Sequence, residues 1–226
     1  MFKWTKLNFL KHYHYGDWLE ELNLPFNSKI GDIGCGNGQL LYEWSMSGYT
    51  SLIGIDPFIA NSKRINSQLR LLKKSIFDID EKFDCLMMHH SFEHMEDPEK
   101  VLDKAFELLN SGGQLLIRIP LADKEAWRKF GADWVQLDAP RHIYLHSESS
   151  VRDLAESAGF ILRKTVFDST PFQFWGSELS KKGISYHKAK LDKLFSKGQL
   201  DEYKKISLQL NKEGQGDQAC FYFVKA

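Results

Sequence analysis

The sequence lacks an excess of charge of either sign and any long apolar run. Its 226 residues carry 30 Lys and Arg against 30 Asp and Glu, so the formal net charge is zero. A protein that grips many phosphates needs a basic surface, so we expect no nucleic-acid partner. No stretch approaches the roughly 20 apolar residues of a membrane span, and the N-terminus has no signal-peptide core. We therefore expect a cytoplasmic protein without a membrane span.

Cysteine is also scarce. The three cysteines, Cys35, Cys85 and Cys220, are far apart and odd in number. Neither a disulfide framework nor a common zinc-binding spacing follows from them. A reducing compartment is the simplest setting for such a chain.

What the sequence does have is a glycine-rich turn after a short apolar segment. Asp32 precedes Gly34, Gly36 and Gly38, and a helix is expected from Gln39 onward. Glycine lets the backbone turn sharply and approach a ligand closely, and the helix N-terminus directs free N–H groups to the same place. Cys35 lies within this loop. The pattern predicts a small-ligand site, although a tight strand–helix turn is its structural alternative.

Asp56 ends the next predicted strand and is placed to accept hydrogen bonds from two ribose hydroxyls. The dinucleotide fingerprint is G-x-G-x-x-G, which seats a pyrophosphate on the helix N-terminus. Here the spacing is G-x-G-x-G, and the acidic Asp32 stands just before it. An acid repels pyrophosphate and suits a ligand with a sulfonium or ammonium charge. S-adenosyl-L-methionine fits this description, and a nicotinamide-dependent oxidoreductase is the less favoured alternative.

Three further segments complete a resemblance to class I S-adenosylmethionine-dependent methyltransferases. Residues 83–98 resemble the fourth strand and following loop of that family, and residues 108–117 resemble its Gly-Gly turn and fifth strand. Residues 138–142, Asp-Ala-Pro-Arg-His, resemble a subgroup that acts on small molecules in bacterial glycan or lipid modification. The likeness extends over residues 29–174.

The resemblance implies further cofactor contacts. Ser75, Ile76 and Phe77, at the end of the third strand, would border the adenine, with Pro57 packing near it. His89, at the end of the fourth strand, would close the site. The cofactor-binding set is thus Asp32, Gly34, Cys35, Gly36, Gly38, Asp56, Pro57, Ser75, Ile76, Phe77 and His89.

Strands alternate with helices along most of the chain, which predicts right-handed βαβ units and a parallel sheet. We expect an α/β, Rossmann-like sheet of seven strands, mostly parallel, with an antiparallel last strand and helices on both faces. One domain, residues 1–226, would contain a helical cover (1–28), a cofactor-binding core (29–120), a substrate loop (121–146) and a helical insertion before the last strand (176–214). That insertion suits dimer contacts, a lid or a solvated surface helix.

Methyl transfer needs mainly alignment and exclusion of water, and it needs a base only when the acceptor must lose a proton. Imidazoles titrate near neutrality, so His142 is the first candidate for a base or acceptor-orienting residue, and His94 with Glu93 is the second. Arg141 could bind an anionic acceptor, or pair with Asp138. No metal is expected, because the spacings match no common motif.

We therefore expect a methyltransferase that acts on a small-molecule or glycan-linked acceptor, favouring oxygen slightly. A non-catalytic cofactor-binding scaffold remains the other alternative.

Overall fold

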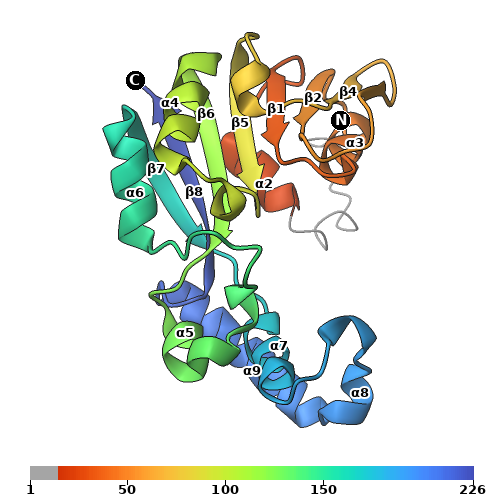
Figure 1. Cartoon of the computed structure of the whole chain (residues 1–226), viewed down its shortest axis with the longest axis vertical. Coiled ribbons are helices and arrows are strands. Elements are labelled where there is room, and N and C mark those ends of the chain that lie inside the picture. The colour runs from red at the N-terminus through yellow and green to blue at the C-terminus, as the bar shows by residue number, and fades with distance from the viewer. Residues whose placement is uncertain (1–14) are drawn as a thin grey trace.

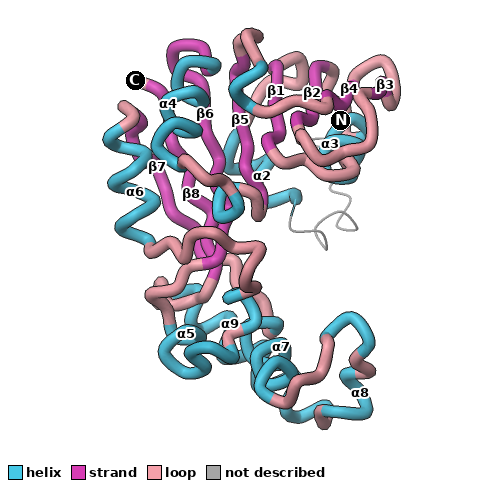
Figure 2. The backbone as a smooth tube through the Cα atoms, in the orientation of Figure 1, coloured by secondary structure: helices cyan, strands magenta, loops and turns pink. Residues whose placement is uncertain are grey.

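The computed structural model describes residues 15–226, and the first fourteen residues of the expected helical cover lie outside this part. Eight strands form one sheet with the order β3-β4-β2-β1-β5-β6-β8-β7, seen as one twisted layer in Figures 1 and 2. The strands are β1 (Lys29–Ile33), β2 (Ser51–Ile55), β3 (Lys63–Arg64), β4 (Leu69–Leu72), β5 (Phe83–His89), β6 (Leu109–Pro120), β7 (Phe160–Phe167) and β8 (Gln218–Lys225).

The seven predicted strands are all present, and the Rossmann-like α/β fold is confirmed. Strands β1, β2, β4, β5 and β6 are parallel, while β8 lies between β6 and β7 and is antiparallel to both. The eighth strand, β3, pairs antiparallel with β4. It occupies the connection between β2 and β4, in which the described chain has no helix. Polar residues in this connection favour turns over a buried helix.

Helices cover both faces of the sheet, and the core is correspondingly split in two. In β5 the alternate residues Leu86 and Met88 belong to one cluster, which includes residues of α4 (Pro98–Leu108) and α6 (Glu148–Ser157). Cys85 and Met87 belong to the other, with residues of α2 (Tyr15–Leu22) and α3 (Gln39–Met46). Because β5 is buried on both faces, its four central residues, 85–88, are all apolar.

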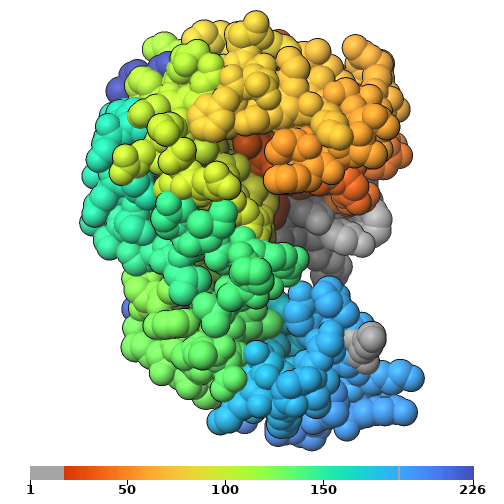
Figure 3. All heavy atoms as spheres, viewed as in Figure 1, coloured from red at the N-terminus to blue at the C-terminus, as the bar shows by residue number. Residues whose placement is uncertain are grey.

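The remaining helices form a separate lobe beyond the carboxyl ends of the parallel strands (Figure 1). In the space-filling view, the surface is hollowed between this lobe and the sheet (Figure 3). The lobe comprises α5 (Glu125–Phe130), α7 (Phe172–Lys181), α8 (Leu191–Leu194) and α9 (Lys197–Lys212). The segment 121–146 is thus partly helical, and the expected insertion at 176 begins earlier, with α7.

A buried hydrogen bond ties the lobe to the sheet. The indole N–H of Trp134 donates to the Asp217 carboxylate at 2.9 Å, just before β8. Burial raises the pKa of Asp217 to about 6, although this hydrogen bond opposes the shift. No helix in residues 15–226 is both long and apolar enough to cross a bilayer.

Candidate functional site

The glycine loop connects β1 to α3 in a conformation that requires glycine. Gly34, Gly36 and Gly38 have φ values of 79°, 54° and 81°, all in the left-handed region. The N–H of Gly34 donates to the Ile55 carbonyl at 2.8 Å, so the loop continues the β1–β2 pairing. A Cβ at Gly36 would meet nothing within 4 Å, so this residue faces open space. The loop therefore offers a cradle that a ligand can approach.

Asp56 follows β2 and holds this loop. Its Oδ2 accepts from the N–H of Gly36 at 2.9 Å, and its Oδ1 accepts from the N–H of Phe58 at 2.8 Å. Each carboxylate oxygen keeps a further lone pair. Asp56 can therefore anchor the loop and still accept hydrogen bonds from a ligand.

Asp32 lies at the end of β1, beneath the loop. It is buried, and its Oδ1 has no hydrogen-bonding partner among the described residues. Burial, with a smaller contribution from the charge of Asp56, raises the pKa of Asp32 to about 7. A buried carboxyl without a partner is costly, and a positively charged ligand would offset that cost.

The residues expected around the adenine follow strands β2 and β4, and their side chains differ in exposure. Ser75 caps the short turn Ile76–Asp78, where its side chain accepts from the N–H of Phe77. Ile76 is buried in the core, whereas Phe77 and Pro57 are exposed. The side chain of Ile76 is therefore turned into the core, whereas those of Phe77 and Pro57 are accessible to a ligand.

Cys35 and His89 are the remaining predicted cofactor residues. Burial, together with the charges of Asp32 and Asp56, raises the pKa of the Cys35 thiol to about 12, so it stays protonated. His89 ends β5, and its ring lies 4.3 Å from that of Trp18, centroid to centroid. Neither of its ring nitrogens has a partner among the described residues, and burial lowers its pKa well below 6.5.

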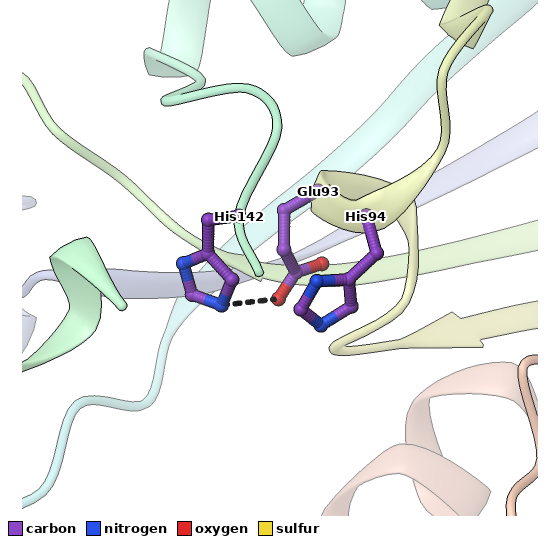
Figure 4. Close-up of side chains that lie close together, drawn as sticks. All are labelled: Glu93, His94 and His142. Atoms are coloured by element: carbon purple, nitrogen blue, oxygen red, sulfur yellow. Dashed lines mark ion pairs between the residues drawn. The ribbon is translucent and has the colours of Figure 1, made fainter. Parts of the chain in front are cut away.

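The acceptor candidates gather in one cluster, formed by Glu93, His94 and His142 (Figure 4). One ligand atom from each lies within 4.8 Å of the others. Glu93 and His94 belong to the turn Phe92–His94 after β5, and the segment carrying His142 is tied to it because the Glu93 carbonyl accepts from the N–H of Ile143 at 2.9 Å. The structure thus places both predicted histidines, His94 and His142, in one cluster with Glu93.

Arg141 lies outside this cluster. Its guanidinium is largely exposed and pairs with the Asp138 carboxylate, as in the structural alternative raised by the sequence. It touches the cluster only through its carbonyl, which lies 2.8 Å from Nδ1 of His94. The side chain is available to a ligand at the surface rather than within the cluster.

A partly buried ionic network beside the cluster could not be predicted from the sequence. Arg118 of β6 donates to the Asp168 carboxylate at 2.6 Å, and its Nη1 lies 2.5 Å from Nε2 of His90. Nδ1 of His90 lies 3.4 Å from the Glu93 carboxylate. The guanidinium also lies 5.1 Å from the ring of Trp18. The one sequence signal is a charged residue, Arg118, among the apolar residues 115–119.

Comparison with known proteins places this geometry in a family. The profile of a methyltransferase domain matches residues 9–165. The chain belongs to this family. Its cofactor is S-adenosyl-L-methionine.

The curated relatives of this methyltransferase resemble only part of it. The tRNA U34 carboxymethyltransferase of Campylobacter hominis is 31% identical over 99 residues, covering 39% of this chain and 35% of that protein. An uncharacterized methyltransferase of Bacillus cereus is 28% identical over 127 residues, covering 51% of this chain and 58% of that protein. The chain thus spans about a third of the length of the first of these relatives.

Solved structures share the fold over nearly the whole chain. A cyclopropane synthase from Mycobacterium tuberculosis has a TM-score of 0.60 at 18% identity, covering 93% of this chain and 82% of that one. A [4+2]-cyclase also has a TM-score of 0.60, at 13% identity, covering 93% and 80%. Likeness at these identities shows the fold alone, because one fold serves several chemistries.

The residues at the glycine loop fit the family's cofactor. The unpartnered Oδ1 of buried Asp32 suits a positive charge, and the open space over Gly36 admits a ligand close to the backbone. An acid at Asp32 would repel the pyrophosphate of a nicotinamide dinucleotide.

Proposed function

We propose that this chain transfers a methyl group from S-adenosyl-L-methionine to an oxygen of a small-molecule or glycan-linked acceptor. The observation that carries the proposal is the pairing of two sites: a loop that suits a cationic nucleoside and a histidine–carboxylate cluster beside it. The two are adjacent because Ser91, two residues before Glu93, donates its hydroxyl to the Ile33 carbonyl at 2.7 Å.

In this proposal the cofactor residues have distinct tasks. Asp32 faces the positive end of the cofactor, and the backbone of Gly34, Gly36 and Gly38 lines its methionine portion. Asp56 holds the ribose while anchoring Gly36. Cys35 contributes to the loop wall. Pro57, Ser75, Ile76 and Phe77 border the adenine, and His89 closes the site at the end of β5.

The acceptor side is assigned to His142 and His94, with Glu93 between them. Nδ1 of His142 lies 2.7 Å from the Gln136 carbonyl, so it carries the proton, and Nε2 keeps a lone pair. Burial lowers the pKa of His142, which favours this neutral form near pH 7. Nε2 can therefore orient an acceptor hydroxyl. Arg141, exposed beside the cluster, would bind an anionic group farther along the acceptor.

Methyl transfer is a single in-line displacement in which S-adenosyl-L-methionine supplies an activated carbon. The chain's contribution is to align the acceptor oxygen with that carbon and to exclude water. Residues 121–146, which carry His142, would act as the substrate loop, and the helical lobe would close over it.

The acceptor class rests on the motif Asp138–His142, which resembles the small-molecule and glycan subgroup. Two observations favour a second candidate, an RNA acceptor. The relatives include tRNA U34 carboxymethyltransferases, and Lys204, Lys205 and Lys212 line a groove of about 500 Å³ on α9. Clustered lysines suit phosphates even on a chain of zero net charge.

A thermal-shift titration with S-adenosylhomocysteine tests the cofactor site, with a nicotinamide dinucleotide as control. At a hundredfold excess over Kd, the product should stabilise the fold by about 2.7 kcal/mol. Stabilisation by the dinucleotide alone would favour an oxidoreductase. Transfer of labelled methyl to hydroxylated small molecules, glycans and unmodified tRNA then identifies the acceptor class. Cofactor binding without transfer to any acceptor would favour the scaffold alternative.

A further inference from the structure

The cluster of Glu93, His94 and His142 has features that the methyl transfer itself does not require. Glu93 is only 1% exposed, and neither of its carboxylate oxygens has a hydrogen-bonding partner among the described residues. Its Oε1 lies 3.9 Å from Nε2 of His142 and 3.4 Å from Nδ1 of His90. A buried carboxylate without hydrogen bonds is strongly disfavoured, so its retention calls for a partner.

Both histidines are fixed by backbone carbonyls. Nδ1 of His94 lies 2.8 Å from the Arg141 carbonyl, and Nδ1 of His142 lies 2.7 Å from the Gln136 carbonyl. Each carbonyl can only accept, so both Nδ1 atoms carry the proton and both Nε2 atoms keep a lone pair. Metal-ligating histidines have this arrangement, in which the second nitrogen donates to a carbonyl or carboxylate.

We propose that Glu93, His94 and His142 bind a divalent transition-metal ion. Two imidazoles and one carboxylate form a recognised catalytic ligand set for zinc and related ions, with at least one coordination position left for water or substrate. Nitrogen ligands favour such ions over Mg²⁺ or Ca²⁺, which prefer oxygen. The three ligand atoms lie within 4.8 Å of one another. A shift of the exposed His94 ring would bring all three to about 2.1 Å from a common metal ion.

The three ligands come from two segments that are separate in sequence. Glu93 and His94 follow β5, and His142 follows the turn at Asp138–Arg141 (Figure 4). The ion would therefore cross-link the cofactor-side turn to the substrate loop. Sequence spacing gives no sign of it, because the third ligand is 48 residues beyond His94 in the chain.

The role of the ion rests on the proposed function, although its binding does not. An acceptor hydroxyl at the open position would have its pKa lowered by the ion and would release its proton to water. The oxygen then forms the bond to the methyl carbon as the carbon–sulfur bond breaks, and the electron pair stays on sulfur. His142 would orient the acceptor through the ion instead of taking its proton.

Metal binding is tested on the full chain after removal of metals with a chelator. Zn²⁺ binding is measured by calorimetry, and Co²⁺ is added as a probe whose visible absorption reports its coordination. We expect one site at which Glu93→Gln and His94→Gln each weaken binding by at least about tenfold. Glu96→Gln is the matched control, because Glu96 is an exposed residue of the same segment, and it should leave the Zn²⁺ affinity unchanged.

His94→Gln keeps the test decisive even where Glu93→Gln fails to fold, because His94 is exposed. Equal Zn²⁺ affinity in wild type and His94→Gln, or no binding to wild type, would overturn the proposal. The thermal shift with S-adenosylhomocysteine is measured in parallel on metal-free protein. A normal shift without metal binding refutes the metal site alone, whereas metal binding without any shift refutes the proposed cofactor site alone.

Discussion

Gly34 and Ser91 touch so closely that no side chain fits between them. A Cβ atom at Gly34 would lie 2.4 Å from the Cβ of Ser91. The hydroxyl of Ser91 donates to the Ile33 carbonyl at 2.7 Å, which locks the two segments together. The contact joins the glycine loop to the turn that carries Glu93 and His94. The cofactor side and the acceptor side of the proposed site are thus held as one rigid unit.

Gly34→Ala should destabilise the fold more than Gly36→Ala. Both residues have positive φ, which costs a substituted residue about 1–2 kcal/mol. At Gly34 the overlap with Ser91 adds about 1–3 kcal/mol, whereas a Cβ at Gly36 meets nothing. Urea unfolding of both variants measures the difference. Equal losses in the two would mean that the Gly34–Ser91 contact relaxes freely.

Asp56→Asn should weaken S-adenosylhomocysteine binding while leaving the protein folded. The amide oxygen can still accept from one backbone N–H, but the amide nitrogen cannot accept from the other. Loss of a charged hydrogen bond to the ribose corresponds to about 1.5–3 kcal/mol, or a Kd weaker by about 10- to 150-fold. Calorimetry gives the Kd, and circular dichroism checks the fold. An unchanged Kd would remove Asp56 from the site.

Asp32→Asn should change how stability depends on pH. The folded pKa of about 7 lies above the ordinary aspartate pKa of 3.8, so the folded state holds the Asp32 proton more tightly than the unfolded state. The Asp32 contribution to stability is therefore complete below about pH 4 and is lost as pH rises through 7.

Above pH 7 the ligand-free Asp32→Asn variant should therefore be more stable than wild type, by on the order of 2–4 kcal/mol. At pH 4 the gain should vanish. Denaturation across this range measures both points, and the same variant should bind S-adenosylhomocysteine no tighter than wild type. A pH-independent difference would show that Asp32 is already ionised in the folded protein.

Arg118→Met should be strongly destabilising, because Arg118 is a mostly buried partner of Asp168. Removing one member of a buried ion pair costs about 3–5 kcal/mol, since the other charge is left without compensation. Arg152→Met is the control: Arg152 pairs with Asp153 on an exposed surface, and its replacement should cost less than about 1 kcal/mol. Guanidinium unfolding compares them, and similar losses would contradict the structural role given to Arg118.

His142→Ala should lower turnover far more than cofactor affinity. A positioned acid–base or orienting group typically contributes about 10²–10⁴-fold to rate. His187→Ala, at an exposed residue of the helical lobe, is the control. Equal losses in kcat and in affinity for S-adenosylhomocysteine would reduce His142 to a structural role.

The sequence by itself determined the local elements and the glycine loop. The start of α3 at Gln39 and the end of β2 next to Asp56 agree with the positions expected from the sequence, because glycines and apolar runs act within a few residues. The sequence also predicted that Asp32 and Asp56 lie at one site, since the carboxyl ends of neighbouring parallel strands meet at one edge of the sheet.

Only the tertiary structure decided how distant polar residues meet. Glu93 and His142 are brought together by backbone hydrogen bonds between segments far apart in the chain. Arg118 of β6 likewise pairs with Asp168, which follows β7 and is 50 residues away in the chain. It also decided that Arg141 pairs with Asp138 at the surface, and that an eighth strand, β3, pairs with β4. Side-chain meetings of this kind depend on packing and burial across the whole fold, for which a linear pattern has no signal.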